Sequence, residues 1–265
     1  MDRKMIEKGR MESMHFIERH EKIIQSLERE KMVKVTELSQ ELEVTEKTIR
    51  QDLILLENKG LLKRIYGGAI LKETAGMLPV EKRQASFLHE KQLAAKAAAA
   101  LVEDEDILFL DGGSTILELA KLLLAFNLTV VTNDIKVAHV LLGGERIQLI
   151  MPGGGRIPSS AGLYGPIAKE ALQKIRVKKL FLGTTGADIH TGLTVFSLFQ
   201  AEYKKDLIAL ADHVILVTDH TKFGQTALIQ YADFHDIDEV ATNSGLSEQW
   251  KNTFEGFGIS VHTAG

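Results

Sequence analysis

Residues Val33–Ala69, VKVTELSQELEVTEKTIRQDLILLENKGLLKRIYGGA, decide the fold of the N-terminal part of the chain. The apolar spacing predicts one helix over Glu37–Leu42 and another over Glu46–Asn58. A strand over Leu61–Tyr66 and a tight turn at Gly67-Gly68 follow. Two helices separated by a short turn and followed by a β-ribbon are typical of a winged helix-turn-helix.

The second helix of this stretch has the pattern of a DNA recognition helix. Ile49, Leu53 and Leu56 are spaced to form a buried stripe, so the polar N-terminal half faces outward. Arg50 is suited to guanine and Gln51 to adenine. Thr36 and Thr45 are expected to cap the two helices, and Lys63 and Arg64 to contact phosphates. The residues expected to contact DNA are Thr36, Thr45, Lys47, Thr48, Arg50, Gln51, Lys63, Arg64 and Tyr66.

An alternative for this module is a helix pair that binds another protein through a solvated charged face. Charge alone does not decide between them, because residues 1–72 carry 15 Lys+Arg against 13 Asp+Glu, whereas the whole chain has a net charge of −4. The combination of helix cap, turn length and ribbon favours DNA binding.

Val33–Ala69 closely resembles the N-terminal signature of the DeoR family of bacterial transcriptional repressors. The residues that match the family pattern are Thr48, Ile49, Arg50, Asp52, Leu53, Gly67, Gly68 and Ala69. The chain departs from that pattern at Thr45 (Ser in the family), Gln51 (Arg) and Tyr66 (His). The resemblance implies an operator-binding regulator, and the departures concern which operator is read.

The rest of the chain alternates short apolar runs with Gly clusters and helical stretches, which predicts a mostly parallel α/β sheet. Strands are expected over 107–110, 129–131, 148–151, 179–182 and 214–218, with further edge strands over 240–242 and 259–262. Helices are expected over 18–29, 91–102, 115–124, 166–175 and 201–210. We expect an extension over 1–15, the winged helix-turn-helix over 16–71, a linker over 72–90 and a larger α/β domain over 91–265. The extension is interpreted as either a disordered arm or an over-long start.

Four loops that follow predicted strands contain Gly with polar residues, and Asp111–Thr115 (DGGST) is the first of them. A Gly-containing turn between a strand and a helix exposes backbone N–H groups to an anion, so this loop could cradle a phosphate or could merely cap its helix. It matches neither the Walker nor the dinucleotide pattern. Because ligands of open α/β sheets bind at the carboxyl ends of strands, convergence of the loops favours a binding site.

The second part resembles the sugar-phosphate sensor of the DeoR family, which is similar in fold to ribose-5-phosphate isomerase. The resemblance implies a phosphorylated sugar or sugar alcohol as effector. The matching positions are Asp111, Gly113, Ser114, Thr115, Thr132, Asn133, Gly154, Arg156, Gly186, Asp188, Glu202, Lys205, Asp219, Lys222 and Gly224. Glu202 and Lys205 could equally form an ordinary surface pair one helical turn apart.

We expect a repressor of a carbohydrate-utilisation operon that a sugar phosphate releases from operator DNA, and that assembles as a homodimer or homotetramer. The alternative is an enzyme, a sugar-phosphate isomerase or deaminase with a regulatory helical domain, for which Asp188, Glu202 or His220 could transfer a proton. The nine His residues show no metal-ligand spacing and the chain has no Cys, so neither metal nor cofactor is expected. The apolar runs are too short to span a membrane, which favours a cytoplasmic location.

Overall fold

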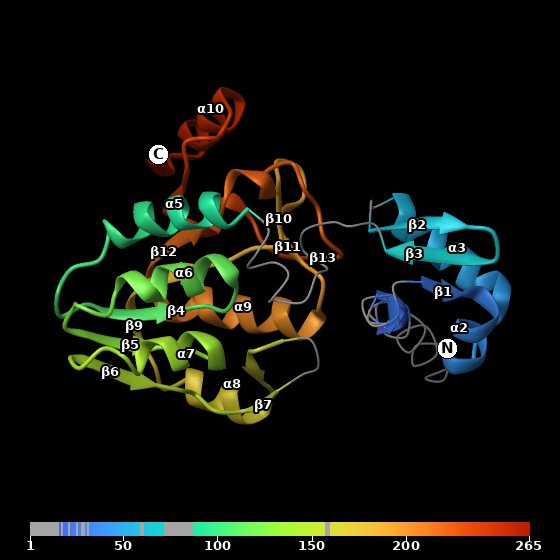
Figure 1. Cartoon of the computed structure of the whole chain (residues 1–265), viewed down its shortest axis with the longest axis horizontal. Coiled ribbons are helices and arrows are strands. Elements are labelled where there is room, and N and C mark those ends of the chain that lie inside the picture. Colours follow the sequence, from blue (N-terminus) through green and yellow to red (C-terminus); the bar gives the residue numbers. More distant parts are fainter. Residues whose placement is uncertain are drawn as a thin grey trace, which may run out of the picture. The chain divides into compact units, whose positions relative to one another are not determined.

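The computed structural model describes residues 16, 18–20, 22–24, 26–27, 30, 32–58, 61–71, 87–156 and 160–265. The chain divides into two compact units, Met1–Leu78 and Pro79–Gly265 (Figure 1). The predicted extension over 1–15, most of the predicted linker over 72–90 and the predicted helix stop at Lys59-Gly60 lie outside the described residues. The domain limits drawn from the sequence therefore stay predictions.

The first unit has the order of elements expected of a winged helix-turn-helix. Strand β1 (Met32–Lys34) leads into helix α2 (Val35–Glu41), and helix α3 (Glu46–Asn58) follows with the bounds that the sequence predicts. Strands β2 (Leu62–Ile65) and β3 (Gly68–Leu71) form a hairpin, and the sheet has the order β1-β3-β2. The wing is thus a three-stranded sheet to which residues before the helices contribute one strand.

A helix before this motif is also expected, and the described residues between 18 and 29 are helical. Ile23, Ile24 and Leu27 are buried in the core of the unit, as the apolar spacing predicts.

Strand β1 is absent from the sequence-based prediction, and it changes the start of helix α2. The helix begins at Val35 with Lys34 in the cap position, and no side chain caps it, so the prediction of Thr36 as its cap is wrong. Val33 pairs with Ala69 of β3. This pairing explains Gly68, because a Cβ there would lie 2.0 Å from the Val33 carbonyl oxygen.

The second unit is built on a seven-stranded sheet of order β15-β14-β12-β9-β4-β5-β6. All neighbouring strands are parallel, which confirms the mostly parallel α/β domain. Strands β5 and β6 lie on one side of β4, whereas β9 and the later strands lie on the other. The strand order therefore reverses between β4 and β9. The strands are β4 (Ile107–Leu110), β5 (Leu128–Val131), β6 (Ile147–Ile150), β9 (Val177–Leu182), β12 (Ala211–Val217), β14 (Glu239–Asn243) and β15 (Ser260–Ala264).

Helices cover both faces of the sheet and enclose two apolar cores (Figure 1). Because side chains alternate along a strand, Leu108 and Leu110 of β4 enter one core while Phe109 enters the other. Helices α5 (Leu88–Ala99), α6 (Ser114–Leu122) and α7 (Ile135–Leu141) pack in the first core. Helices α8 (Pro166–Leu172), α9 (Leu198–Leu210) and α10 (Glu248–Phe257) pack in the second. The sequence analysis predicts neither α7 nor α10. Trp250 of α10 packs against the rings of Phe223 and Phe254.

Smaller elements follow the sheet strands. Strands β7 (Gly155–Arg156) and β8 (Leu163–Tyr164) form a short hairpin after β6. Strands β10 (Gly186–Asp188), β11 (Gly192–Val195) and β13 (Ile229–Ala232) form a second, antiparallel sheet. The 3-10 turns η1 (His220–Lys222) and η2 (Phe234–Asp236) lie after β12 and β13.

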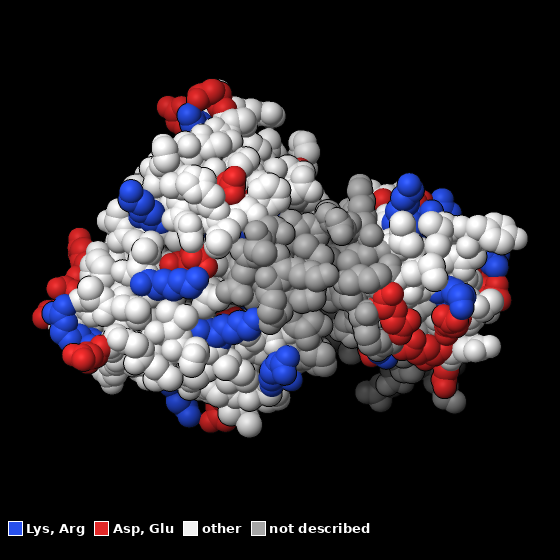
Figure 2. Space-filling view, in the orientation of Figure 1, with Lys and Arg blue, Asp and Glu red and all other residues white. Residues whose placement is uncertain are grey.

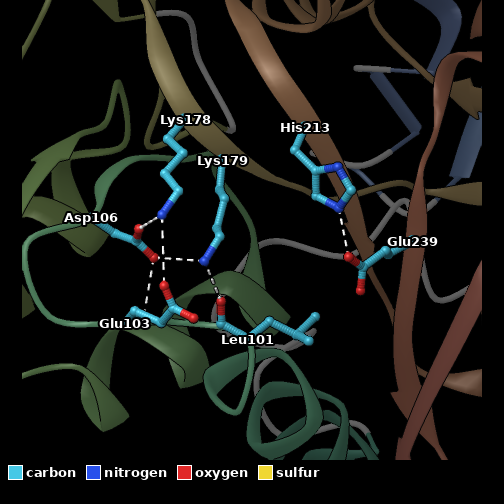
Figure 3. A network of polar contacts seen from close by, with 7 residues as sticks. All are labelled: Leu101, Glu103, Asp106, Lys178, Lys179, His213 and Glu239. Carbon is cyan, nitrogen blue, oxygen red and sulfur yellow. Dashed lines mark hydrogen bonds and ion pairs between the residues drawn. The ribbon is translucent and has the colours of Figure 1, made fainter.

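Ion pairs occupy the amino ends of the sheet strands (Figure 3). Asp106, before β4, accepts hydrogen bonds from Lys178 at 2.8 Å and from Lys179 at 2.7 Å, both on β9. His213 of β12 contacts Glu239 of β14 through Nε2 at 2.5 Å. These contacts fix neighbouring strands at the end of the sheet opposite to the polar Gly loops.

Candidate functional site

Helix α3 presents its polar N-terminal half to solvent. The Thr45 hydroxyl accepts a hydrogen bond of 3.1 Å from the Thr48 N–H, which confirms Thr45 as the helix cap. Ile49, Leu53 and Leu56 are at most 1% exposed, so the predicted buried stripe is confirmed. The side chains expected to read base edges, Lys47, Arg50 and Gln51, are exposed. Lys47 and Gln51 lie opposite the buried stripe, and Arg50 lies at its flank.

Both arginines expected to bind DNA, Arg50 and Arg64, form ion pairs with acidic neighbours. Arg50 pairs with Glu46 one turn earlier at 2.5 Å. Arg64 of the wing donates to Glu57 of α3 at 2.6 Å, and this hydrogen bond, together with the Arg64 N–H, lowers the pKa of Glu57. DNA phosphates or bases would have to replace these carboxylates as partners of the arginines. Lys63 and Tyr66 are exposed on the wing.

Acidic and basic side chains are interspersed on the face of the described first unit that Figure 2 shows. This face therefore has no unbroken basic patch, and the features that favour DNA binding are the recognition helix and the wing rather than net charge.

The buried carboxylate of Asp52 holds helix α3 in place on the side that faces the core of the unit. Asp52 is 2% exposed and accepts hydrogen bonds from Arg19 Nε at 2.6 Å and Nη2 at 3.0 Å, while His20 Nε2 lies 3.0 Å away. Burial alone would raise the pKa of Asp52, but the His20 and Arg19 contacts outweigh burial and lower it. The recognition helix is thereby tied to the helix that precedes the motif.

In the second unit, the polar residues converge at the carboxyl edge of the sheet, where the strand order reverses. Asp111 directly follows β4, and its Oδ2 accepts a hydrogen bond of 3.0 Å from the N–H of Gly183, which follows β9. The same oxygen contacts the ammonium group of Lys204 on α9. This ammonium also donates to the Gly183 carbonyl at 2.8 Å. The buried Asp111–Lys204 pair therefore joins both central strands to α9.

Lys204 is absent from the residues singled out from the sequence, which instead include its neighbours Glu202 and Lys205. Those two side chains are more than half exposed, and Lys205 Nζ lies 4.0 Å from Glu202 Oε1. They therefore form the ordinary surface pair that the sequence analysis gives as the alternative to a role in the site. Lys204 lies on the buried face of α9 with Ala201 and Leu207. Lys204 lies at a helix position where the spacing of the apolar residues predicts an apolar side chain. A lysine at such a position is the sequence signal that could have identified it as a site residue.

Helix α6 starts three residues after Asp111 and has no side-chain cap. Gly113 stands in the cap position with a φ of 132°, a conformation that favours glycine. The first N–H groups of a helix lack acceptors within the helix, so this end can hold an anion. Ser114 and Thr115 of the first turn are at most 9% exposed, and their hydroxyls belong to the same end of the helix.

Asp134 adds a second carboxylate at this edge. It caps α7 through hydrogen bonds from the N–H groups of Lys136 and Val137, and a Cβ on Gly112 would lie 2.7 Å from its Oδ2. Burial, with a contribution from the charge of Asp111, raises the pKa of Asp134 in spite of these N–H donors. Gly112 thus allows the DGGST loop to pass close to a carboxylate.

The loops after β5 and β6 bring further predicted residues to this edge. Thr132 is fully buried and accepts a hydrogen bond of 3.2 Å from the Asp134 N–H. Asn133 donates through Nδ2 to the Leu163 carbonyl at 3.2 Å. A Cβ on Gly154 would lie 2.5 Å from the Tyr164 carbonyl oxygen.

Arg156 is also in this region, but it points to solvent. Its side chain is exposed, and Nε donates to the Ser160 carbonyl at 2.9 Å within the turn of the β7–β8 hairpin.

A second polar cluster follows β12. Asp219 is fully buried, accepts a hydrogen bond of 3.1 Å from the Thr221 N–H and lies 3.7 Å from the Lys91 ammonium group. Lys222 is 8% exposed, and the Gly224 N–H donates to Ala187 of β10 at 2.8 Å. The DHTKFG loop is therefore fixed to the second sheet.

Gly186 and Asp188 lie on β10, beside this loop. Asp188 accepts hydrogen bonds of 3.0 Å from the N–H groups of His190 and Thr191. Burial alone would raise the pKa of Asp188, but these N–H donors lower it, which makes its carboxylate a weak base. Gly186 is buried, and a Cβ there would lie 2.4 Å from the Gln225 carbonyl oxygen.

Comparison with known proteins finds two family descriptions along the chain. The DeoR-like helix-turn-helix domain matches residues 19–75, and the DeoR C terminal sensor domain matches residues 86–244. The chain belongs to the DeoR family. This DeoR-family protein is a DNA-binding transcriptional regulator, which confirms the resemblance drawn from the recognition helix and the polar loops.

Curated relatives of this DeoR-family regulator are similar over most of their length. The putative aga operon transcriptional repressor of Escherichia coli O157:H7 is 32% identical over 94% of this chain and 94% of the relative. The glycerol-3-phosphate regulon repressor of Escherichia coli K12 is 31% identical over 86% of this chain and 90% of the relative. Among solved structures, ribose 5-phosphate isomerase A of Methanocaldococcus jannaschii matches 50% of this chain and 53% of that chain, with 18% identity and a TM-score of 0.37.

No described helix is long and apolar enough to cross a membrane. No group of three or more His, Cys, Asp or Glu side chains among these residues is placed to hold a metal ion.

Proposed function

We propose that this regulator represses a carbohydrate-utilisation operon and that a phosphorylated sugar or sugar alcohol releases it from operator DNA. Its location would be the cytoplasm, where both ligands occur. The observation that carries the proposal is the uncapped N-terminus of α6, three residues after the buried Asp111–Lys204 pair, at the reversal of strand order. The names of the relatives, an aga operon repressor and a glycerol-3-phosphate regulon repressor, agree with it.

Each part of the edge has a distinct role in this proposal. The α6 N-terminus with Ser114 and Thr115 binds the phosphate group, with Lys204 as the nearest buried cation on α9. Asp111 and Asn133 face the sugar hydroxyls. The residues Gly113, Thr132, Gly154, Arg156, Gly186, Asp188, Glu202, Lys205, Asp219, Lys222 and Gly224 remain proposed effector contacts from the family resemblance.

On the DNA side, Arg50 and Gln51 read base edges while Lys63 and Arg64 bind phosphates. Two recognition helices of a symmetric homo-oligomer would read the two halves of an operator.

The test is operator binding by the full chain with a duplex selected from a random library. Fluorescence anisotropy should show tight binding by the parent protein, at least about 100-fold weaker binding by Arg50→Ala, and release of the parent by one member of a phosphosugar panel. Thermal unfolding of Arg50→Ala should still shift with that phosphosugar as in the parent. Turnover of a phosphosugar by a protein that binds no DNA would instead support the isomerase or deaminase alternative.

A further inference from the structure

Among the buried polar atoms at the carboxyl edge of the sheet that have no hydrogen-bond partner in the described residues, two belong to residues linked to the Asp111–Lys204 pair. They are the hydroxyl oxygen of Tyr203 on α9 and Oδ1 of Asn133 after β5. Tyr203 is 5% exposed and Asn133 is 1% exposed, so bulk water does not reach them. Most buried polar groups in native proteins are hydrogen-bonded, and an unpaired one indicates a bound molecule that completes it.

We propose that Tyr203, together with Asn133 Oδ1, binds hydroxyl groups on the carbon chain of the effector and so selects for its polyol part. This inference rests on the proposed phosphosugar site and assigns Tyr203 to it as a specificity-determining residue. The phosphate is held elsewhere in the same site, at the N-terminus of α6.

The fold links the residues that carry both atoms to the Asp111–Lys204 pair, and the charge of Asp111 acts on the Tyr203 hydroxyl. Asn133 is fixed by its hydrogen bond to Leu163, and the next residue, Tyr164, packs edge-on against Tyr203 with ring centroids 5.2 Å apart. Tyr203 in turn precedes Lys204, which contacts Asp111. A continuous chain of contacts therefore runs from the end of β5 to the end of β4.

The chemistry of the two atoms matches an uncharged hydroxyl rather than a phosphate. Because Asn133 Nδ2 donates to a carbonyl, the unpaired atom is the amide oxygen, which only accepts hydrogen bonds. Burial, and next the charge of Asp111, raise the pKa of Tyr203 above its usual range, so its hydroxyl stays protonated and can donate as well as accept. A sugar hydroxyl can bridge such a pair, whereas the oxygens of a phosphate dianion would meet the amide oxygen as a second acceptor.

A nearby tyrosine provides a matched control. The hydroxyl of Tyr231, which is 3% exposed, donates to the Gly183 carbonyl at 3.0 Å. Tyr231→Phe therefore removes a hydrogen bond that exists without ligand, whereas Tyr203→Phe removes none among the described contacts.

The experiment compares the full-length parent, Tyr203→Phe and Tyr231→Phe by thermal unfolding and calorimetry. The probes are inorganic phosphate, glycerol 3-phosphate, ribose 5-phosphate, fructose 6-phosphate and N-acetylgalactosamine 6-phosphate. Without ligand, Tyr203→Phe should unfold at or above the parent temperature and Tyr231→Phe below it. Tyr203→Phe should bind the best phosphosugar about 10-fold to 100-fold more weakly than the parent does, with its affinity for inorganic phosphate unchanged.

The remaining outcomes overturn the inference. If Tyr203→Phe bound the phosphosugar as tightly as the parent does, the hydrogen-bond partner of the Tyr203 hydroxyl would be water and not the effector. Equal losses for phosphosugar and phosphate would show a structural role. If no probe binds the parent, the proposed effector class fails and this inference fails with it.

Discussion

Lys204 and Lys179 are both paired with a buried carboxylate, but they stand at opposite ends of the central strands. Lys204 contacts Asp111 at the carboxyl edge, and Lys179 contacts Asp106 at the amino edge. Removing one partner of a buried ion pair leaves an uncompensated charge, at a cost of about 3–5 kcal/mol. Both pairs therefore stabilise the sheet, while only Lys204 lies beside the proposed phosphate site.

We expect Lys204→Met to lower the free energy of unfolding by up to about 3–5 kcal/mol, and Lys179→Met to lower it by less, because Lys178 still pairs with Asp106. Phosphosugar binding should weaken at least about 10-fold in Lys204→Met alone, since only this variant loses the cation on the α9 side of the site. Urea unfolding and calorimetry measure the two effects. Equal phosphosugar affinities for Lys204→Met and the parent would remove Lys204 from the site.

At the scale of elements, Asp52 fixes the recognition helix to the preceding helix through Arg19 and His20. The pKa of this carboxyl is lower in the folded chain than its ordinary value of 3.8. A lowered folded pKa gives stability that is complete above the unfolded pKa and is lost as the pH falls through the folded pKa.

Asp52→Asn should therefore cost about 2 kcal/mol of unfolding free energy at pH 7, since hydrogen bonds to a charged group are lost. The difference from the parent should stay constant down to about pH 5 and shrink below about pH 4. Urea titrations at several pH values measure this dependence. Glu37→Gln, which breaks the exposed 2.7 Å pair with Lys34, is the control and should change stability by less than about 1 kcal/mol. A difference that grows on acidification would contradict the proposed role of the charge.

Helices and strands could be predicted where the spacing of apolar residues within the segment itself indicates them. The stripe of Ile49, Leu53 and Leu56 gave helix α3 with its observed bounds. Strand β1 is only three residues long and is stabilised by pairing with β3, some 35 residues later, so no local pattern indicates it. Helix α7 has only seven residues, and Asp134 caps its start.

The same limit applies to the site. The loop after β4 could be predicted because Gly and hydroxyl residues after a strand are typical of anion sites. Lys91 and Lys204 could not be paired with Asp219 and Asp111 from the sequence, because each contact joins segments that only the folded sheet brings together. In hindsight, both lysines lie at apolar positions of their helices.

At the scale of the whole molecule, the two units must influence each other if a sugar phosphate controls DNA binding. Effector and operator would then prefer different arrangements of one assembly, and linkage requires their effects to be reciprocal. We expect the effector to weaken operator binding by about 5-fold to 150-fold and the operator to weaken effector binding by the same factor. Anisotropy and calorimetry on one preparation measure both factors.

Arg50→Ala is the control for this reciprocity. Because Arg50→Ala should bind the operator at least about 100-fold more weakly, duplex at a concentration that saturates the parent should leave the effector affinity of this variant nearly unchanged. If saturating operator also left the effector affinity of the parent unchanged, effector and operator would not be linked through one coupled equilibrium.

The position of β4 inside the sheet, between β5 and β9, has a consequence for synthesis on the ribosome. Its neighbours are β5, which follows directly, and β9, whose Lys179 pairs with Leu108 about 70 residues later. Until β9 has left the exit tunnel, β4 presents an unpaired backbone edge between apolar faces, a condition that favours self-association of nascent chains. Folding yield of the second unit should therefore depend on how soon translation reaches β9, while the first unit, complete by residue 71, does not wait for it.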